Sequence, residues 1–259
     1  MSGRIAVAGA TGVVGRLLVD VLRERGSTVV PLARATGVDL ATGQGLDDAL
    51  VGVEAVVDVS NRTTAKAGAS IDYFSRATTT VLQAEQRHGV RHHVVLSIVG
   101  VDSVRYGYYA GKLEQERLTE AGPVPFTILR ATQFHEFAEQ MLGRMRLGPV
   151  AIVPRIVVQP IAAAEVAQRL ADLVEAGPSG RVLDLAGPGQ HTLLEMTRKV
   201  CRANGQPTLL IPVKVPGPGG RLMTEGGLLP QGQFDIGQLT FDDWLAGRSH
   251  QPSSDHGDG

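Results

Sequence analysis

The chain lacks several features that would assign it to a specialised class of protein. It has one cysteine, Cys201, in 259 residues, so it cannot form an internal disulfide and nothing in it requires an oxidising compartment. It also lacks an excess of charge of one sign, because 25 Lys and Arg residues nearly balance 26 Asp and Glu residues. The net charge of -1 provides no positive field, which disfavours binding to nucleic acid or to an anionic membrane.

Long hydrophobic runs are absent as well. A membrane-spanning helix needs about 18 or more consecutive apolar residues, and no stretch of the sequence has that length. The apolar segment after Arg4 superficially resembles a secretory signal, but it contains Gly9 and Gly12 and continues directly into an amphipathic helical pattern. We therefore expect this segment to belong to the mature fold and the protein to be cytoplasmic.

Alternating strand and helix patterns make up the first half of the chain. With 43% hydrophobic residues, the sequence is rich enough in apolar side chains to bury a substantial core. The predicted strands are 4–8, 28–32, 55–59, 93–97 and 126–130, and the predicted helices are 13–25, 70–88 and 108–121. Mostly uninterrupted apolar strands alternating with helices predict an α/β protein with a doubly wound, Rossmann-type parallel sheet.

The pattern loosens after Gly148, where we expect a small C-terminal α/β substrate lobe. Its predicted strands are 150–153 and 182–185, and its predicted helices are 162–176 and 192–203. The expected division is therefore a Rossmann domain over 1–148, an interleaved lobe over 149–247 and a disordered tail over 248–259. The Gly- and Pro-rich segment 212–230 is interpreted as a loop with a short helix, suited to form a lid.

The strongest local signal is the glycine-rich turn Gly9-Ala10-Thr11-Gly12-Val13-Val14-Gly15, between the first strand and the first helix. Glycines allow positive φ and a close approach of the backbone, and the free N–H groups of the helix start suit a pyrophosphate. The spacing GxxGxxG differs by one residue from the dinucleotide fingerprint GxGxxG. The predicted cofactor-binding residues here are Gly9, Thr11, Gly12, Val13, Val14 and Gly15.

The end of the second strand favours NADP(H) over NAD(H). An acidic residue at this place would bind the adenosine 2′-hydroxyl, but the sequence has Arg34 there instead. A guanidinium group can bind a 2′-phosphate through a planar fork of N–H donors, although a solvated surface arginine is the alternative. Asp39 and Leu40 follow, and we expect them to border the adenine.

Ser97, Tyr108 and Lys112 form the predicted catalytic group. Ser97 ends the fourth strand, where open α/β sheets place their ligands, and would orient the substrate oxygen. Tyr108 and Lys112 are four residues apart, so a helix puts them on one face, where the ammonium group would lower the phenol pKa for proton transfer. Tyr109 is three residues from Lys112, so either tyrosine, or neither, fits the spacing.

Together these motifs resemble the short-chain dehydrogenase/reductase superfamily, and within it the atypical, NmrA-like NAD(P)-binding branch. The resemblance extends over about residues 4–246 and also includes the segments 126–130, 182–188 and 240–245. It implies that the backbone of 11–14 binds the pyrophosphate, Arg34 the 2′-phosphate and Lys112 the nicotinamide ribose. It further implies that Asp39 and Leu40 lie at the adenine and that Val59 and Ser60 line the cofactor.

Other candidate sites are weaker. His88, His92 and His93 span a helix end, and His135 with Glu139 lacks a third ligand, so a metal site is not expected. The segment after the fifth strand contains three residues that we expect to line a substrate pocket: Gln133, Phe134 and Phe137. Their aromatic rings are equally suited to a hydrophobic core.

The first functional hypothesis is an NADP(H)-dependent oxidoreductase that transfers a hydride between the nicotinamide and a small organic carbonyl or activated double bond. The resembling branch also includes members that bind the nucleotide without turnover. The second hypothesis is therefore a catalytically silent redox sensor that reports to a protein partner. A third is an isomerase that returns the hydride to its product.

Overall fold

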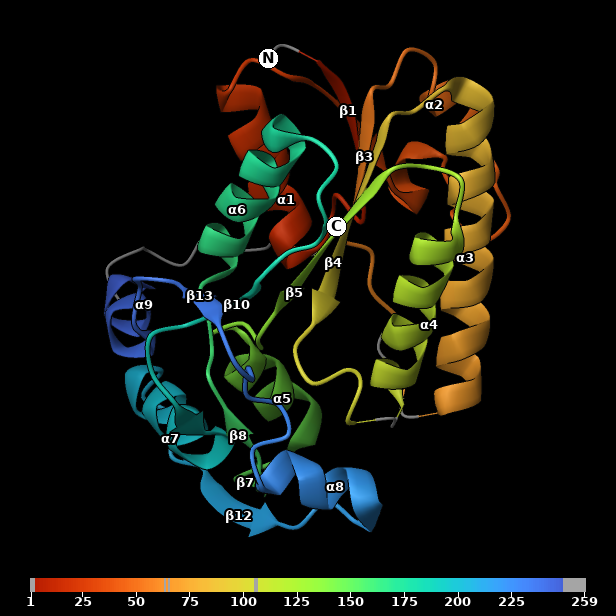
Figure 1. Cartoon of the computed structure of the whole chain (residues 1–259). Coiled ribbons are helices and arrows are strands. Elements are labelled where there is room, and N and C mark those ends of the chain that lie inside the picture. The colour runs from red at the N-terminus through yellow and green to blue at the C-terminus, as the bar shows by residue number, and fades with distance from the viewer. Residues whose placement is uncertain (1–2, 63, 65, 105–106, 249–259) are drawn as a thin grey trace.

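A parallel β-sheet forms the centre of the molecule (Figure 1). The computed structural model describes residues 3–62, 64, 66–104 and 107–248. Within these residues one eight-stranded sheet has the order β13-β10-β5-β4-β3-β1-β2, with β9 paired to β5. Its first five strands in chain order are β1 (Arg4–Ala8), β2 (Thr28–Leu32), β3 (Ala55–Asp58), β4 (His92–Ile98) and β5 (Phe126–Ala131). The predicted α/β, Rossmann-type fold is confirmed.

Helices cover both faces of this sheet, which explains why its strands are apolar on both sides (Figure 1). On one face α1 (Val13–Glu24) packs against α6 (Ala163–Ala176). On the other face α3 (Ala67–His88) packs against α4 (Tyr108–Ala121). The short helices η1 (Arg34–Thr36) and α2 (Leu46–Ala49) follow β2.

The chain from residue 137 onward contributes both to the layers of the large sheet and to a group of smaller elements at one end of it. Helix α6 and the strands β9 (Gly180–Arg181), β10 (Asp184–Ala186) and β13 (Phe234–Ile236) belong to the layers of the large sheet. The remaining elements gather at one end of the sheet with α5 (Figure 1). These are α5 (Phe137–Met145), β6 (Arg146–Leu147), β7 (Val150–Pro154), β8 (Val157–Val158), β11 (His191–Thr192), α7 (Leu193–Ala203), β12 (Leu209–Val213), α8 (Gly217–Thr224) and α9 (Phe241–Arg248).

Most predicted elements are found within a few residues of their expected ends, but the strand expected over 182–185 is wrong. The chain forms two short strands instead, with Val182 and Leu183 between them. Gly180 and Arg181 pair with β5 near its start, whereas Leu185 pairs with Ala131 at its end. Because of this break, β9 pairs with the start of β5, whereas β10 pairs with the end of β5 and with β13.

The end of α9 corrects the expected start of the tail. Arg248 is the last residue of this helix, where its guanidinium lies 4.8 Å from the centre of the Trp244 ring and pairs with Glu139. Residues 249–259, the rest of the predicted tail, lie outside the described residues. Among the described helices, none is both long and apolar enough to cross a membrane.

Candidate functional site

A cavity of about 440 Å³ opens at the carboxyl ends of the central strands. Strand β1 lies between β2 and β3, so the chain reverses direction across the sheet at this point, which is where doubly wound folds bind ligands. The cavity contains eight predicted site residues of the large sheet and its helices: Gly12, Val13, Val14, Val59, Ser60, Ser97, Tyr108 and Lys112. A more open hollow of about 550 Å³ between α7 and β12 contains no predicted site residue.

The glycine-rich turn brings the start of α1 against the end of β3. Gly9 has a φ of 80°, and a Cβ atom there would lie 2.8 Å from the backbone of Ser60. A Cβ atom on Gly15 would lie 2.1 Å from the Gly9 carbonyl oxygen, so only glycine permits this packing. The Gly12 amide donates to the Gly9 carbonyl at 2.9 Å, which closes the turn. The first amides of α1 have no acceptor within the helix, and Gly12, Val13 and Val14 line the cavity. This cradle fits a pyrophosphate.

Two arginines border the expected adenosine end. Arg34 is exposed at the start of η1, directly after β2. Arg62, which follows β3, places its guanidinium 5.0 Å from the centre of the Tyr73 ring. Burial raises the Tyr73 pKa, and the positive charges of Arg62 and Arg34 oppose that shift, so both arginines lie near this phenol. Sequence reasoning missed Arg62, because its closeness to Tyr73 depends on how α3 packs.

Asp39 and Leu40 have structural contacts of their own. The Asp39 carboxylate accepts hydrogen bonds from the amides of Ala41 and Thr42 at 2.9 and 3.1 Å. Leu40 is 8% exposed and packs in a core cluster with Leu46. Since the Leu40 side chain is buried, only its backbone could face an adenine.

Lys112 is a buried cation that lines the cavity. It is 1% exposed, and its ammonium donates hydrogen bonds to the Leu96 carbonyl, at 2.6 Å, and to the Gln115 side chain. Gln115 in turn donates to Asp58 at 2.8 Å, which links the lysine to the end of β3. Burial lowers the Lys112 pKa to about 8. The phenyl ring of Phe74 lies 5.2 Å from the ammonium.

The two adjacent tyrosines both line the cavity but belong to different surroundings. The Tyr108 ring packs beside Phe74 of α3, whereas the Tyr109 hydroxyl accepts a hydrogen bond from Gln133 at 3.3 Å. Burial raises the pKa of Tyr108 above its usual range and that of Tyr109 to about 12. The expectation that Lys112 lowers the Tyr108 pKa is therefore wrong, because the ammonium is directed to Leu96 and Gln115.

Ser97 is 2% exposed, and its hydroxyl lies beside Glu116 of α4. Burial opposes the ionisation of Glu116, but the neighbouring Arg130 and Ser97 outweigh this effect and hold the carboxyl pKa below its ordinary value. The Ser97 hydroxyl is itself buried and has no hydrogen-bond partner among the described residues. Its predicted contact with a substrate oxygen stays a prediction.

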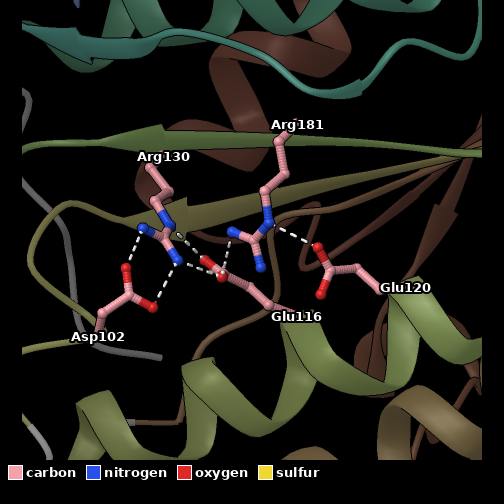
Figure 2. Close-up of polar contacts among 5 residues, drawn as sticks. All are labelled: Asp102, Glu116, Glu120, Arg130 and Arg181. Atoms are coloured by element: carbon pink, nitrogen blue, oxygen red, sulfur yellow. Dashed lines mark hydrogen bonds and ion pairs between the residues drawn. The ribbon is translucent and has the colours of Figure 1, made fainter.

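Glu116 belongs to a charged cluster that sequence reasoning also missed (Figure 2). The cluster joins α4, β5, β9 and the loop between β4 and α4, and it consists of Asp102, Glu116, Glu120, Arg130 and Arg181. Arg130 binds Asp102 on one side and Glu116 on the other. The loop that connects Ser97 to Tyr108 is therefore tied to the end of β5.

The expected substrate residues Gln133, Phe134 and Phe137 all line the cavity. Sequence reasoning did not find the residues that complete this end: Gln140, Met141 and Arg144 of α5, with Ile156, Met223 and Leu228. Met223 and Leu228 come from the segment 212–230, which borders the cavity as a helix and loop. Among the described residues, no group of three or more His, Cys, Asp or Glu is placed to hold a metal ion.

Comparison with known proteins agrees with this geometry. The sequence profile of a family described as NAD(P)H-binding matches residues 9–176, which include the glycine-rich turn and both tyrosines. The chain therefore belongs to the NAD(P)H-binding family. The NAD(P)H-binding family that the resemblance implies is thus confirmed.

One curated relative is the chloroplastic divinyl chlorophyllide a 8-vinyl-reductase of Oryza sativa subsp. indica, 26% identical over 250 residues. The alignment covers 82% of this chain and 61% of the relative, so the chain spans less than two thirds of that protein. Two solved structures share the fold. A short-chain dehydrogenase/reductase superfamily protein from Agrobacterium tumefaciens with bound NAD has a TM-score of 0.66 at 20% identity, covering 95% of this chain and 96% of its own. An NADPH-dependent quinone oxidoreductase from Escherichia coli has a TM-score of 0.67 at 19% identity, covering 94% and 99%.

Proposed function

We propose that this protein is an NADP(H)-dependent oxidoreductase that transfers a hydride between the nicotinamide and a small organic carbonyl or activated double bond. The observation that carries the proposal is that one continuous cavity joins the glycine-rich turn to the predicted substrate residues. It extends from the start of α1, at Gly12, past Lys112 and Tyr108 to the apolar residues of α5. A cofactor bound along its first part would bring its reactive ring beside a substrate in the second part.

The cofactor, when bound, supplies or accepts the hydride. The proton goes to or comes from the substrate oxygen, and we assign this transfer to the Tyr108 hydroxyl. Burial raises the Tyr108 pKa, so the phenol carries its proton at neutral pH. An oxygen that gains negative charge during reduction would accept this proton. In this direction the hydride forms the new C–H bond, and Tyr108 provides the proton of the new O–H bond.

Lys112 serves as a fixed positive charge in this proposal. The Leu96 carbonyl and the Gln115 side chain hold its ammonium at the cavity floor, close to where the resemblance places the nicotinamide ribose. Its third N–H remains for a ribose hydroxyl, since an ammonium group has three donors. Asp58 supports the arrangement through Gln115 and favours the charged form of the lysine.

The preference for NADP(H) is part of the proposal and depends on Arg34 and Arg62. Both positive charges lie near Tyr73, and neither arginine has a carboxylate partner among the described residues. A 2′-phosphate would receive charge-assisted hydrogen bonds from guanidinium groups at this place. NAD(H) has only a hydroxyl there and would gain much less.

The relatives support the reaction class. The rice protein is named a vinyl reductase, and the Escherichia coli protein is named an NADPH-dependent quinone oxidoreductase. Both names describe the reduction of a conjugated organic molecule. We extend only this reaction class to the present chain, and Tyr108, Lys112 and Ser97 remain the proposed catalytic residues.

A redox sensor without turnover is the second candidate, and one observation favours it. The Lys112 ammonium donates to Leu96 and Gln115, and the Ser97 hydroxyl has no hydrogen-bond partner in the part of the chain that the structure describes. Within the described residues, the three predicted catalytic side chains are therefore not hydrogen-bonded to one another. In a sensor the nucleotide would bind in the same cradle, and a protein partner would detect the bound state. The cavity end formed by α5 would then not hold a reacting substrate.

Two measurements on the purified protein test the proposal. Titration with NADPH, NADP⁺, NADH and NAD⁺ should show saturable binding, tightest for the two phosphorylated nucleotides. NADPH oxidation should then be followed with a panel of aldehydes, ketones, quinones and enones. No binding of any nucleotide rejects both candidates, whereas NADPH binding without oxidation of the cofactor by any compound supports the sensor.

A further inference from the structure

One face of α5 forms the wall of the cavity that lies farthest from the glycine-rich turn. Phe137, Gln140, Met141 and Arg144 are three or four residues apart and all line the cavity. In an α-helix this spacing puts the four side chains on one face. The other cavity residues at this end are Ile156, Met223 and Leu228.

This wall is apolar except for Gln140 and Arg144. An apolar wall of aromatic, methionine and branched side chains suits a flat hydrophobic ligand, because rings and thioethers make favourable contacts with aromatic groups. A sugar would require many hydrogen-bond partners for its hydroxyl groups. At this end Gln133 and Gln140 are the only amide side chains that line the described cavity.

Arg144 gives the wall a positive charge without a partner. Its side chain is exposed and has no hydrogen bond or ion pair within the described part of the chain, where the lining contains no Asp or Glu. Charged residues close to Arg144 in the chain do have partners. Glu139 on another side of α5 binds Arg248, and Arg146 binds Gln206 and the Gly148 carbonyl. Arg144 thus lines the cavity, and its guanidinium donors have no partner among the described residues.

The geometry of α5 also sets the distance between the two polar ends of a ligand that fits this part of the cavity. Arg144 is seven residues after Phe137, which corresponds to about 10 Å along a helix axis at 1.5 Å per residue. Phe137 lines the cavity together with Gln133 and Tyr109, whose side chains are hydrogen-bonded to each other. A ligand that reacts near the tyrosines and reaches the guanidinium therefore has its two polar ends about 10 Å apart.

We infer that the substrate is a flat, apolar carbonyl or enone compound that carries a carboxylate about 10 Å from its reacting group, and that Arg144 binds this carboxylate. A guanidinium fork matches the two oxygens of a carboxylate. The inference rests on the proposed function, because it names the substrate class of the same cavity. It adds a specificity-determining residue, Arg144, which takes no part in hydride or proton transfer.

The test compares two probes that differ only in charge. 6-Acetyl-2-naphthoic acid has a ketone at one end of a flat ring system and a carboxylate at the other, and its methyl ester lacks the charge. Both are titrated into the full chain by calorimetry, with and without NADP⁺, which cannot reduce the ketone. We expect the acid to bind about tenfold more tightly than the ester.

Arg144→Leu should reduce this acid-to-ester ratio to near one while leaving the affinity for the ester unchanged, which also shows that the variant is folded. Arg23→Leu is the matched control, because Arg23 is exposed on α1 and likewise has no partner among the described residues. The control should keep the wild-type ratio. Equal binding of acid and ester, no binding of either, or an unchanged ratio in Arg144→Leu would overturn the inference.

A failure of the proposed function would give a different experimental result from a failure of the inference about Arg144. If NADP⁺ does not bind, or if NADPH never reduces the acetyl group, the oxidoreductase proposal is rejected or weakened while the acid-to-ester ratio is still measured. The binding titration needs no hydride transfer. The two conclusions are therefore judged by separate readouts.

Discussion

Glu116 of α4 and Arg130 of β5 form a bidentate ion pair, with Nε–Oε1 and Nη2–Oε2 distances of 2.9 and 2.6 Å (Figure 2). The Glu116 side chain is fully buried, so its charge depends on this partner and on Arg181. Arg130 also binds Asp102, in the loop that precedes Tyr108. The pair thus holds the helix with the proposed proton donor against the sheet.

Replacing Arg130 with Met should destabilise the protein by about 3 kcal/mol, because it breaks a buried ion pair and leaves Arg181 as the remaining partner of the buried Glu116 carboxylate. Urea unfolding measures the difference. Arg117→Met is the control, since Arg117 forms an exposed pair with Glu114 on the same helix and its loss should have little effect. Equal stabilities of the two variants would contradict the structural role of Arg130.

Tyr108→Phe should lower turnover by about 10²- to 10⁴-fold, the usual contribution of a positioned general acid. NADPH affinity should not change, because the hydroxyl is assigned to the substrate. Tyr109→Phe is the comparison, and it should retain most of the turnover, since its hydroxyl is bonded to Gln133. Stopped NADPH oxidation in Tyr109→Phe, with normal oxidation in Tyr108→Phe, would assign the proton to Tyr109.

Arg34→Ala should weaken NADPH binding by about 10- to 100-fold, as expected for losing a charged hydrogen bond to a phosphate. NADH binding should change little. Arg62→Ala should act in the same direction but less strongly, because its guanidinium already stacks on Tyr73. Arg76→Ala, which removes an exposed pair with Asp72 on α3, serves as the control. Parallel losses for NADPH and NADH in Arg34→Ala would argue against phosphate recognition.

Stability should fall as the pH decreases from about 6.5 to about 4, partly because of His92. Burial lowers its pKa from 6.5 to about 4, so in this range the unfolded chain binds a proton that the folded protein excludes. The contribution is present in full above pH 6.5 and amounts to about 3 kcal/mol at most. His92→Gln should flatten the pH dependence of urea unfolding between pH 7 and 4.5, and an unchanged slope would reject this assignment.

The sequence by itself determined the architecture of the large sheet. Apolar runs such as 4–8 and 126–130 become strands covered on both faces, because such runs cannot be exposed on either side. The glycine-rich turn could also be predicted from the sequence, since only glycine tolerates the contact between Gly9 and Gly15. These features depend on local chemistry and on residues close together in the chain.

Tertiary structure decided where the charges and the cavity walls lie. The sequence placed Lys112 on the same helix face as Tyr108, but the fold directs its ammonium to Leu96 and Gln115. It brings Arg181 to Glu116 across 65 residues and Arg62 to Tyr73 through the packing of α3. Such contacts join segments whose separation in the chain carries no periodic signal. Side-chain direction, burial and pKa therefore follow from packing, which the local pattern of residues does not contain.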